Sequence, residues 1–268
     1  MNTVLKDHND TLLIERPSEH VFQVTFNRPE RRNAMNTAMG RDLLEWFETL
    51  SLQPNQARCV VLTGAGDKAF CAGGDLKERN GMTDDQWVAQ HLVYERLTRA
   101  ILYCPVPVIA AVNGAAFGGG TELASNCDFI YAAASARFAL TETSLGIMPG
   151  SGGTQQLSRA VGMRRAKELI LSAKPFSAHE AAEWGLVNKV LPDEELIPAT
   201  LEVARSIAGN APIATRQAKQ SISRGYDMSI GDGLAFEIEA YNRMIPTEDR
   251  QEGVRAFNEK RSPEFKGR

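Results

Sequence analysis

The chain has 268 residues, of which 43% are hydrophobic and 24% are charged. This length and composition predict a globular protein with one large domain, or a domain with an appended helical part. The 30 basic and 33 acidic residues give a net charge of -3, which excludes a surface that attracts nucleic acid or an acidic membrane non-specifically, so any anionic ligand must be held by a local site.

The first 149 residues predict strands alternating with helices. Strands are expected where apolar and β-branched residues alternate or run together, and helices where apolar residues recur on one face. Pro17 and Ser18 are expected to form the turn of an initial hairpin, and Asn36 and Thr83 to cap two helices. The strands are expected at 11–15, 21–26, 59–62, 106–112 and 129–132, and the helices follow Asn36, Thr83 and Gly118. This alternation favours right-handed crossovers and largely parallel pairing.

Beyond Pro149 the sequence becomes mostly helix-forming. Apart from the glycine-rich segment that opens this part, the expected helices are 164–171, 178–184, 196–208, 214–224, 231–243 and 247–257. Only residues 186–191 indicate a strand. The apolar faces of these helices could pack on the chain's own core or on another subunit, and both arrangements remain open.

The stretch AAVNGAAFGGGTELA, residues 110–124, joins the end of a predicted strand to the start of a predicted helix. Its three consecutive glycines permit a sharp turn and the close approach of a ligand. If the helix begins near Gly119, its first amide hydrogens have no partner within the helix and would stabilise a developing oxyanion. Gly119 and Glu122 are three residues apart, so this amide and this carboxylate can point into one pocket.

A second acid, Glu142, lies in the mainly apolar segment FALTETSLGIMPGSGGTQ. If Glu142 reaches the same pocket as Glu122, burial and mutual repulsion would hold one proton between the two carboxylates at neutral pH. Such a pair is suited to general acid–base catalysis with a water molecule as reactant. The alternative is that Glu142 only caps the glycine-rich loop that follows it, and its spacing alone favours that alternative.

The segment FCAGGDLK, residues 70–77, is a third feature. Ala72, Gly73 and Gly74 offer amide hydrogens in a close-approach turn, and Lys77 adds a cation. An ordinary glycine-rich turn with a solvated lysine accounts for the same residues. Neither glycine segment fits the spacing of a nucleotide-phosphate cradle. The histidines have no metal-binding or triad spacing, so no metal is expected.

The cysteines and the first residues of the chain indicate its compartment. Cys59, Cys71, Cys104 and Cys127 lack CxxC spacing, which predicts buried, reduced thiols. The start MNTVLKDHNDTLLIERP has neither an apolar signal core nor an arginine-rich, acid-poor transit pattern. No apolar run reaches membrane-spanning length. We expect a soluble cytoplasmic protein with no membrane partner. A processed organellar form, from which the targeting peptide has been removed, remains open.

Four segments, AAVNGAAFGGGTELA, FCAGGDLKER, FALTETSLGIMPGSGGTQQLSRAVG and AFNEKRSPEFKG, together resemble the crotonase, or enoyl-CoA hydratase/isomerase, family. The resemblance runs from about residue 11 to the C-terminus and is closest to the methylglutaconyl-CoA hydratase type, through DLKER and IPTEDRQEGVRAFNEKR. It implies an α/β fold: a crotonase-like spiral of ββα units over residues 1–200, then a helical trimerisation region over residues 201–268, with trimers commonly stacked into hexamers. It also implies an acyl-CoA substrate. Coenzyme A would be part of that substrate, and no separate cofactor is implied.

The resemblance implies roles for particular residues. Gly74 and Gly119 match the positions whose amides polarise the thioester carbonyl, although alanine is more usual at the position of Gly74. Glu122 and Glu142 match the two glutamates of hydratases. Glu122 is then the base that activates water, and Glu142 is the acid that supplies the α-proton. The positions that match coenzyme A contacts are Ala72, Asp75, Leu76, Lys77, Phe257 and Lys260, the last two reaching in from a neighbouring subunit.

Several activities fit this resemblance. Both glutamates are present, which favours an enoyl-CoA hydratase, a lyase of fatty acid metabolism, because isomerases of the family often keep only one. The alternatives are an isomerase, a dehydratase of a carnitinyl- or methylglutaconyl-CoA thioester, and a non-catalytic acyl-CoA or RNA-binding member. The helix GRDLLEWFETLSLQ has almost no lysine or arginine, which argues against RNA binding. The acyl pocket is expected to be lined by the helix after Lys77, by Phe117 and Met148, and by the C-terminal helices. Met82, Trp87 and Val88 are candidate walls, and core packing is the favoured alternative for Trp87.

Overall fold

The larger of two β-sheets organises the core of the computed structural model, which describes residues 8–268. Its seven strands lie in the order β1-β2-β3-β4-β6-β8-β11. The first two pairs are antiparallel, and every pair from β3 to β11 is parallel. The strands are β1 (His8–Asn9), β2 (Leu12–Ser18), β3 (Val21–Phe26), β4 (Cys59–Gly64), β6 (Val108–Val112), β8 (Phe129–Ala133) and β11 (Lys189–Leu191). The predicted parallel pairing is therefore confirmed.

The initial hairpin differs from its prediction at the turn. Ser18 still belongs to β2 and pairs with Val21, so the turn consists of the two residues between them. The expectation that Pro17 and Ser18 form the turn is wrong. The register shifts between Glu15 and Ser18, and this irregularity accommodates Pro17, which has no amide hydrogen to donate to a strand.

The last strand of the sheet is shorter than predicted. The segment 186–191 contributes only Lys189–Leu191 to β11. The amides of Leu186 and Val187 both donate to the carbonyl of Ala181 in the preceding helix. These two residues therefore end that helix, because their amides satisfy one of its free carbonyls.

A smaller sheet was not predicted. Its four strands lie in the order β10-β9-β7-β5 and consist of β5 (Ala69–Cys71), β7 (Ala115–Phe117), β9 (Arg137–Ala139) and β10 (Phe176–Ser177). β5, β7 and β9 are parallel to one another, and β10 is antiparallel to β9. Strands of two or three residues carry too few side chains to show a period of two, which is why the sequence did not reveal them.

The two long helices of the first half begin where their caps predict. The Asn36 side chain accepts a hydrogen bond from the Met39 amide at the start of α1 (Thr37–Leu52). Thr83 and Gln86 form a capping box at the start of α3 (Asp84–Leu102). α1 and α3 pack against each other, and α8 (Leu196–Ala208) packs across β3, β4, β6 and β8. Together these elements enclose one hydrophobic core, in which all four cysteines are buried free thiols.

Shorter helices lie beside the two sheets, and two of them contact strands of both. They are α2 (Leu76–Arg79), α4 (Gly119–Ser125), α5 (Gly153–Val161), α6 (Met163–Ser172) and α7 (Ala178–Glu183). Three 3-10 turns, η1 (Pro29–Arg31), η2 (Glu142–Leu145) and η3 (Asp193–Glu195), complete this part. Across residues 8–268, no helix combines the length and the apolarity that crossing a membrane requires.

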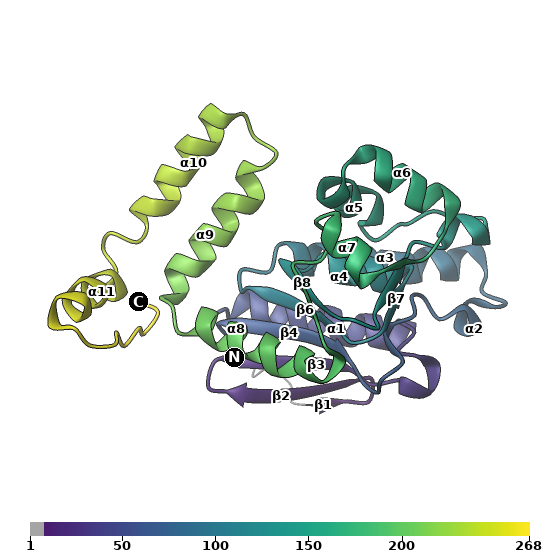
Figure 1. Cartoon of the computed structure of the whole chain (residues 1–268), viewed down its shortest axis with the longest axis horizontal. Coiled ribbons are helices and arrows are strands. Elements are labelled where there is room, and N and C mark those ends of the chain that lie inside the picture. Colours follow the sequence, from purple (N-terminus) through teal and green to yellow (C-terminus); the bar gives the residue numbers. More distant parts are fainter. Residues whose placement is uncertain (1–7) are drawn as a thin grey trace.

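The last three helices form an arm that projects from the core. α9 (Pro212–Gly225) and α10 (Ile230–Asn242) lie side by side, and α11 (Glu248–Glu259) follows near the base of the arm (Figure 1). All six helices predicted at 164–257 are present, each to within two residues at either end. The arm leaves large apolar side chains in solvent, including Ile222 at 74%, Ile230 at 83% and Phe257 at 84% exposure.

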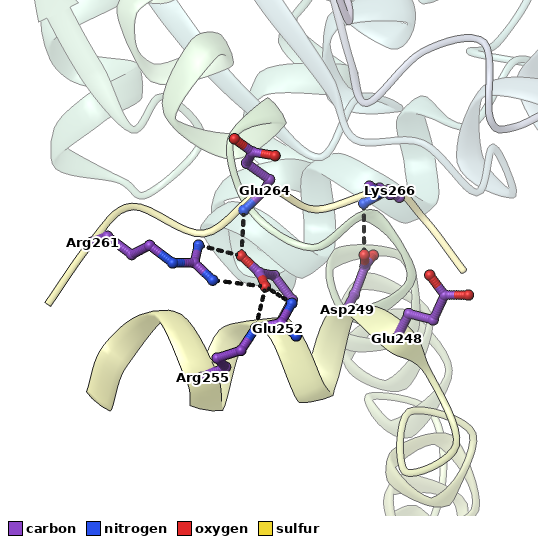
Figure 2. A pocket seen from close by; sticks show the side chains of 7 residues that line it. All are labelled: Glu248, Asp249, Glu252, Arg255, Arg261, Glu264 and Lys266. Atoms are coloured by element: carbon purple, nitrogen blue, oxygen red, sulfur yellow. Dashed lines mark hydrogen bonds and ion pairs between the residues drawn. The ribbon is translucent and has the colours of Figure 1, made fainter. Parts of the chain in front are cut away.

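The C-terminal segment folds back along α11 and is held there by two carboxylates (Figure 2). Glu252 forms ion pairs with Arg255 and Arg261 and accepts the Glu264 amide at 3.0 Å. Asp249 accepts the amides of Lys266 and Gly267 at 2.6 and 2.8 Å. Charge-assisted hydrogen bonds of this kind are among the stronger ones in proteins, so they fix the chain end against the arm.

Candidate active site

Three parallel strands of the smaller sheet deliver the segments that the sequence singles out. β5 leads into the Ala72–Asp75 turn, β7 leads into the glycine turn before α4, and β9 leads into η2, which starts at Glu142. Because the carboxyl ends of parallel strands meet at one edge of a sheet, three segments separated in sequence lie together. This juxtaposition depends on the sheet that the sequence did not predict.

These segments line a cavity of about 620 Å³. Of the predicted site residues, Ala72, Gly74, Leu76, Gly119, Glu122 and Glu142 contribute to its wall. Trp87, Val88 and Met148 line it as expected, whereas Phe117 and Met82 do not. Its remaining wall includes Met35, Gly73, Arg79, His91, Tyr94, Gly118, Thr141, Leu145, Ile147, Pro149, Gly150 and Ser151.

The amides of Gly74 and Gly119 lie close together at this cavity. A methyl group built on Gly119 would lie 3.7 Å from the Gly74 nitrogen, and one built on Gly73 would lie 3.3 Å from the Gly119 nitrogen. Gly119 is the first residue of α4, as predicted, so its amide has no partner within the helix. Neither amide donates a hydrogen bond to another described residue. Both are therefore available to an oxygen atom in the cavity.

Two glycines permit this approach of the two turns. Gly73 has φ +93°, and a methyl group on it would lie 2.7 Å from the carbonyl oxygen of Phe117. On Gly120, a methyl group would lie 1.9 Å from the carbonyl oxygen of Cys71. Only glycine fits at such positions, because a side chain would separate α4 from the turn that follows β5.

Glu122 is a buried carboxylate with a defined hydrogen-bonding environment. Its Oε1 accepts the amides of Ser151 at 2.7 Å and Gly153 at 2.9 Å. Burial raises the pKa of Glu122, while these two amides and the charge of Arg79 oppose the rise. Glu122, and not Glu142, thus satisfies the glycine-rich loop before α5. The alternative that Glu142 serves only as the cap of this loop is not supported by the hydrogen bonds.

Glu142 has a different environment. Its Oε2 is buried and has no hydrogen-bond partner among residues 8–268. Burial raises the pKa of Glu142 to about 7, and the nearby charge of Glu122 adds to the rise. At neutral pH the protonated form of Glu142 is therefore well populated, whereas the ionised form of Glu122 receives two backbone hydrogen bonds. The pair has the asymmetry that an acid and a base require.

We expect the Glu142→Gln variant to gain thermal stability over the native protein as the pH rises. Unfolded, Glu142 loses its proton near its usual pKa of 4.5, whereas the folded protein holds the proton up to about pH 7. The native protein therefore loses stability across this window, and a glutamine, which does not ionise, removes that loss. Melting temperatures at about pH 5 and about pH 8 measure the effect. Glu202→Gln, on the exposed side of α8, is the control, and an equal difference at both pH values would contradict the prediction.

The residues that match coenzyme A contacts fall into separate groups. Ala72 and Leu76 line the cavity, whereas the Asp75 side chain pairs with Arg28 at 2.9 Å and caps α2. Lys77 is exposed on α2. Phe257 and Lys260 belong to the arm, and α11 lies at the opposite end of the molecule from α2 (Figure 1). Within one chain, these two residues cannot reach the cavity.

Several residues in the cavity wall, and Gln90 behind it, were not predicted as part of the site. Arg79 and Gln90 are hydrogen-bonded at 2.8 Å, and Tyr94 donates to the Met35 carbonyl at 2.8 Å. His91 also lines the cavity, although the spacing of the histidines indicated neither a metal site nor a triad. The only sequence signal is that Gln90, His91 and Tyr94 belong to the helix after Lys77, which was expected to line the acyl pocket; for Arg79 there was none.

Comparisons with known proteins cover nearly the whole chain. The family model described as enoyl-CoA hydratase/isomerase matches residues 16–268. The chain is 41% identical to the short-chain-enoyl-CoA hydratase of Clostridium acetobutylicum, covering 97% of this chain and 99% of that protein. It is 38% identical to the 2,3-dehydroadipyl-CoA hydratase of Escherichia coli, covering 96% and 99%. The crystal structure of an enoyl-CoA hydratase from Bacillus anthracis superimposes with a TM-score of 0.91 at 45% identity, covering 96% of this chain and 100% of that chain.

Proposed function

This chain belongs to the enoyl-CoA hydratase/isomerase family and has its crotonase fold, and we propose that it is an enoyl-CoA hydratase. The proposed reaction is the addition of water across the 2,3 double bond of a 2-enoyl-CoA thioester. The observation that carries the proposal is that one cavity is lined by two buried carboxylates and by two residues whose amides have no hydrogen-bond partner among residues 8–268. Relatives that are named as hydratases support the same reaction class.

The two amides would stabilise the charge that develops on the thioester. Attack of water at C3 moves electrons through the double bond to the carbonyl oxygen and forms an enolate. The amides of Gly74 and Gly119 are fixed donors for that oxygen, and the positive end of α4 adds to their effect. Because the enolate carries more charge than the ground-state carbonyl, these donors stabilise the transition state more than the substrate.

The two glutamates would divide the proton transfers. Glu122, whose ionised form accepts the loop amides, takes a proton from the attacking water, and the resulting hydroxyl group bonds to C3. Glu142, whose pKa is raised to about 7 by burial, gives its proton to C2 as the enolate collapses. The proton then returns from Glu122 to Glu142 through exchange with solvent, which restores the pair.

Contacts to coenzyme A and the assembly of subunits extend this proposal. Ala72, Asp75, Leu76 and Lys77 would contact the coenzyme from the same chain. Phe257 and Lys260 would do so from a neighbouring copy, because the arm carries them away from the chain's own cavity. The exposed apolar side chains of the arm support an assembly of copies into trimers or into hexamers of two trimers, since burying such surface is favourable.

Water labelled with heavy oxygen tests the reaction directly. We expect the protein to convert crotonyl-CoA to a 3-hydroxyacyl-CoA that carries one labelled oxygen at C3. Mass spectrometry of the product, with an unlabelled reaction and an enzyme-free reaction as controls, measures the incorporation. An isomerase incorporates no label, so turnover of a suitable enoyl-CoA without incorporation would contradict the hydratase proposal. Tight acyl-CoA binding without turnover of any thioester would support a non-catalytic binder.

A further inference from the structure

Arg79 places a positive charge in the wall of the active-site cavity. Its guanidinium lies over the Trp87 ring, 4.3 Å from the centroid, and 5.7 Å from that of Tyr94. Its Nε donates to Gln90 Oε1 at 2.8 Å. Within residues 8–268, Arg79 forms no ion pair with a carboxylate. The two Nη groups are thus left with donors that no described side chain uses.

The orientation of this guanidinium is fixed by a chain of hydrogen bonds. Gln90 Nε2 donates to Thr37 Oγ1 at 2.8 Å and to Glu78 Oε2 at 2.7 Å. These two contacts use the amide nitrogen of Gln90 and leave its oxygen to accept from Arg79. The Trp87 ring holds the plane of the guanidinium from one side through a cation–π contact. Arg79 is therefore held in place before a ligand arrives.

Gly74 allows Arg79 to lie next to one of the two proposed oxyanion amides. A methyl group built on Gly74 would lie 3.2 Å from both Cζ and Nη1 of Arg79, which is closer than most Cβ contacts. The guanidinium therefore occupies space that an alanine at this position would contest. Since Gly74 also supplies one of the two proposed oxyanion amides, the charge of Arg79 lies close to the proposed oxyanion site, in the same cavity.

Apolar side chains form part of the same cavity wall. Val88, Leu145, Ile147 and Met148 line the cavity alongside Arg79. A purely hydrocarbon acyl group would suit these residues and would leave the two Nη groups of Arg79 without a hydrogen-bond acceptor. A carboxylate would accept charge-assisted hydrogen bonds from the two Nη groups, in the planar geometry that arginine recognises best.

We propose that Arg79 binds a carboxylate on the acyl group, so that the substrate class is a 2-enoyl-CoA whose acyl chain bears a second acid group. The choice of an unsaturated thioester rests on the proposed hydratase function, whereas the choice of a carboxylate rests on Arg79. Gln90 is a positioning residue, since it acts on the substrate only through Arg79, whereas Trp87 both positions Arg79 and lines the cavity itself. A hydrocarbon acyl group is the competing substrate class, and the selectivity arises because it leaves the guanidinium unpaired.

Matched pairs of thioesters test this assignment. Each pair has the same chain length and differs in a terminal carboxylate: glutaconyl-CoA against 2-pentenoyl-CoA, and 2,3-dehydroadipyl-CoA against 2-hexenoyl-CoA. We expect the native protein to favour the acidic member in kcat/KM. In Arg79→Gln, the ratio of acidic to neutral kcat/KM should fall roughly 10- to 100-fold, as expected for the loss of a hydrogen bond between charged groups. Arg79→Lys, which keeps the charge but loses the planar fork, should give an intermediate ratio.

A surface arginine provides the control. Arg99→Gln removes the same charge from the exposed face of α3, where Arg99 pairs with Glu95, and should leave the ratio unchanged. A proportional loss on both members of each pair in Arg79→Gln would overturn the proposal and would assign Arg79 to the oxyanion or to the two glutamates. A native preference for the neutral members would overturn it as well.

Binding of saturated analogues separates this proposal from the hydratase proposal. Calorimetric titration with glutaryl-CoA and pentanoyl-CoA requires no turnover. We expect tighter binding of glutaryl-CoA by the native protein and loss of that preference in Arg79→Gln. If no thioester is hydrated, the hydratase proposal fails while this measurement still decides the role of Arg79. Equal affinity of the native protein for the two analogues would overturn the carboxylate assignment.

Discussion

Replacing Glu122 by glutamine is expected to lower kcat for crotonyl-CoA hydration about 10³-fold, the size typical of a lost general base. Glutamine has nearly the same shape, and its side-chain oxygen can still accept the amides of Ser151 and Gly153, which bond to Glu122 Oε1 at 2.7 and 2.9 Å. The loop before α5 should therefore stay in place. What the variant loses is the ability to take a proton from water.

Steady-state kinetics and thermal melting together check this expectation. The Glu122→Gln variant should melt as a folded protein and bind butyryl-CoA, which shows that the cavity is intact. Glu202→Gln removes an exposed carboxylate of α8, away from the cavity, and should keep native turnover. Near-native kcat in Glu122→Gln would reject Glu122 as the base and would transfer that role to Glu142 or to another group.

A proline at position 119 is expected to lower kcat about 10²- to 10³-fold, the usual cost of losing one oxyanion donor. Gly119 is the first residue of α4, where proline is well tolerated because the missing amide hydrogen has no partner in the helix. The substitution therefore removes the proposed donor with limited damage to the helix. The neighbouring Gly74 amide would remain.

Alanine at the same position is the matched control. A Cβ on Gly119 would have Gly73 Cα and Gly74 N as its nearest neighbours, both at 3.7 Å, which is ordinary contact. Gly119→Ala keeps the amide hydrogen and should retain most of the activity. If kcat falls as far in Gly119→Ala as in Gly119→Pro, the added side-chain bulk, and not the loss of the amide hydrogen, lowers the activity. Native activity in folded Gly119→Pro would reject the amide as an oxyanion donor.

The contrast between the two glutamates could not be obtained from their spacing. The sequence places both acids near glycine-rich segments and assigns the cap of the second segment, as an alternative, to Glu142. In the structure that loop bonds to Glu122, and Glu142 Oε2 stays unpaired. Burial raises the pKa of both acids, and the loop amides stabilise the ionised form of Glu122 alone. Such differences arise from neighbours that are distant in the chain.

The position of Arg79 in the cavity wall also depends on residues that are distant in the chain. It follows Lys77 by two residues in a charged segment, where a solvated side chain is the ordinary expectation. Its contacts with Gln90 and Trp87 come from another helix, α3. A helical pattern shows which residues of α3 share a face, but it does not show which side chain of α2 that face meets.

The sequence by itself determined the helices whose starts are set by neighbouring residues in the chain. Caps at Asn36 and Thr83, apolar faces, and the glycine turn before Gly119 predicted where α1, α3 and α4 begin, because capping and backbone freedom depend on neighbouring residues. The resemblance of its motifs also identified the family, which the comparisons confirm over residues 16–268.

Only the tertiary structure decided how the site is assembled. Three strands of three residues each, β5, β7 and β9, bring two glycine turns and two glutamates to one edge of a sheet. Strands this short have no periodicity of their own and form because the surrounding core aligns them. The environments that distinguish Glu122 from Glu142, and that hold Arg79 beside Gly74, therefore exist only once the chain has folded.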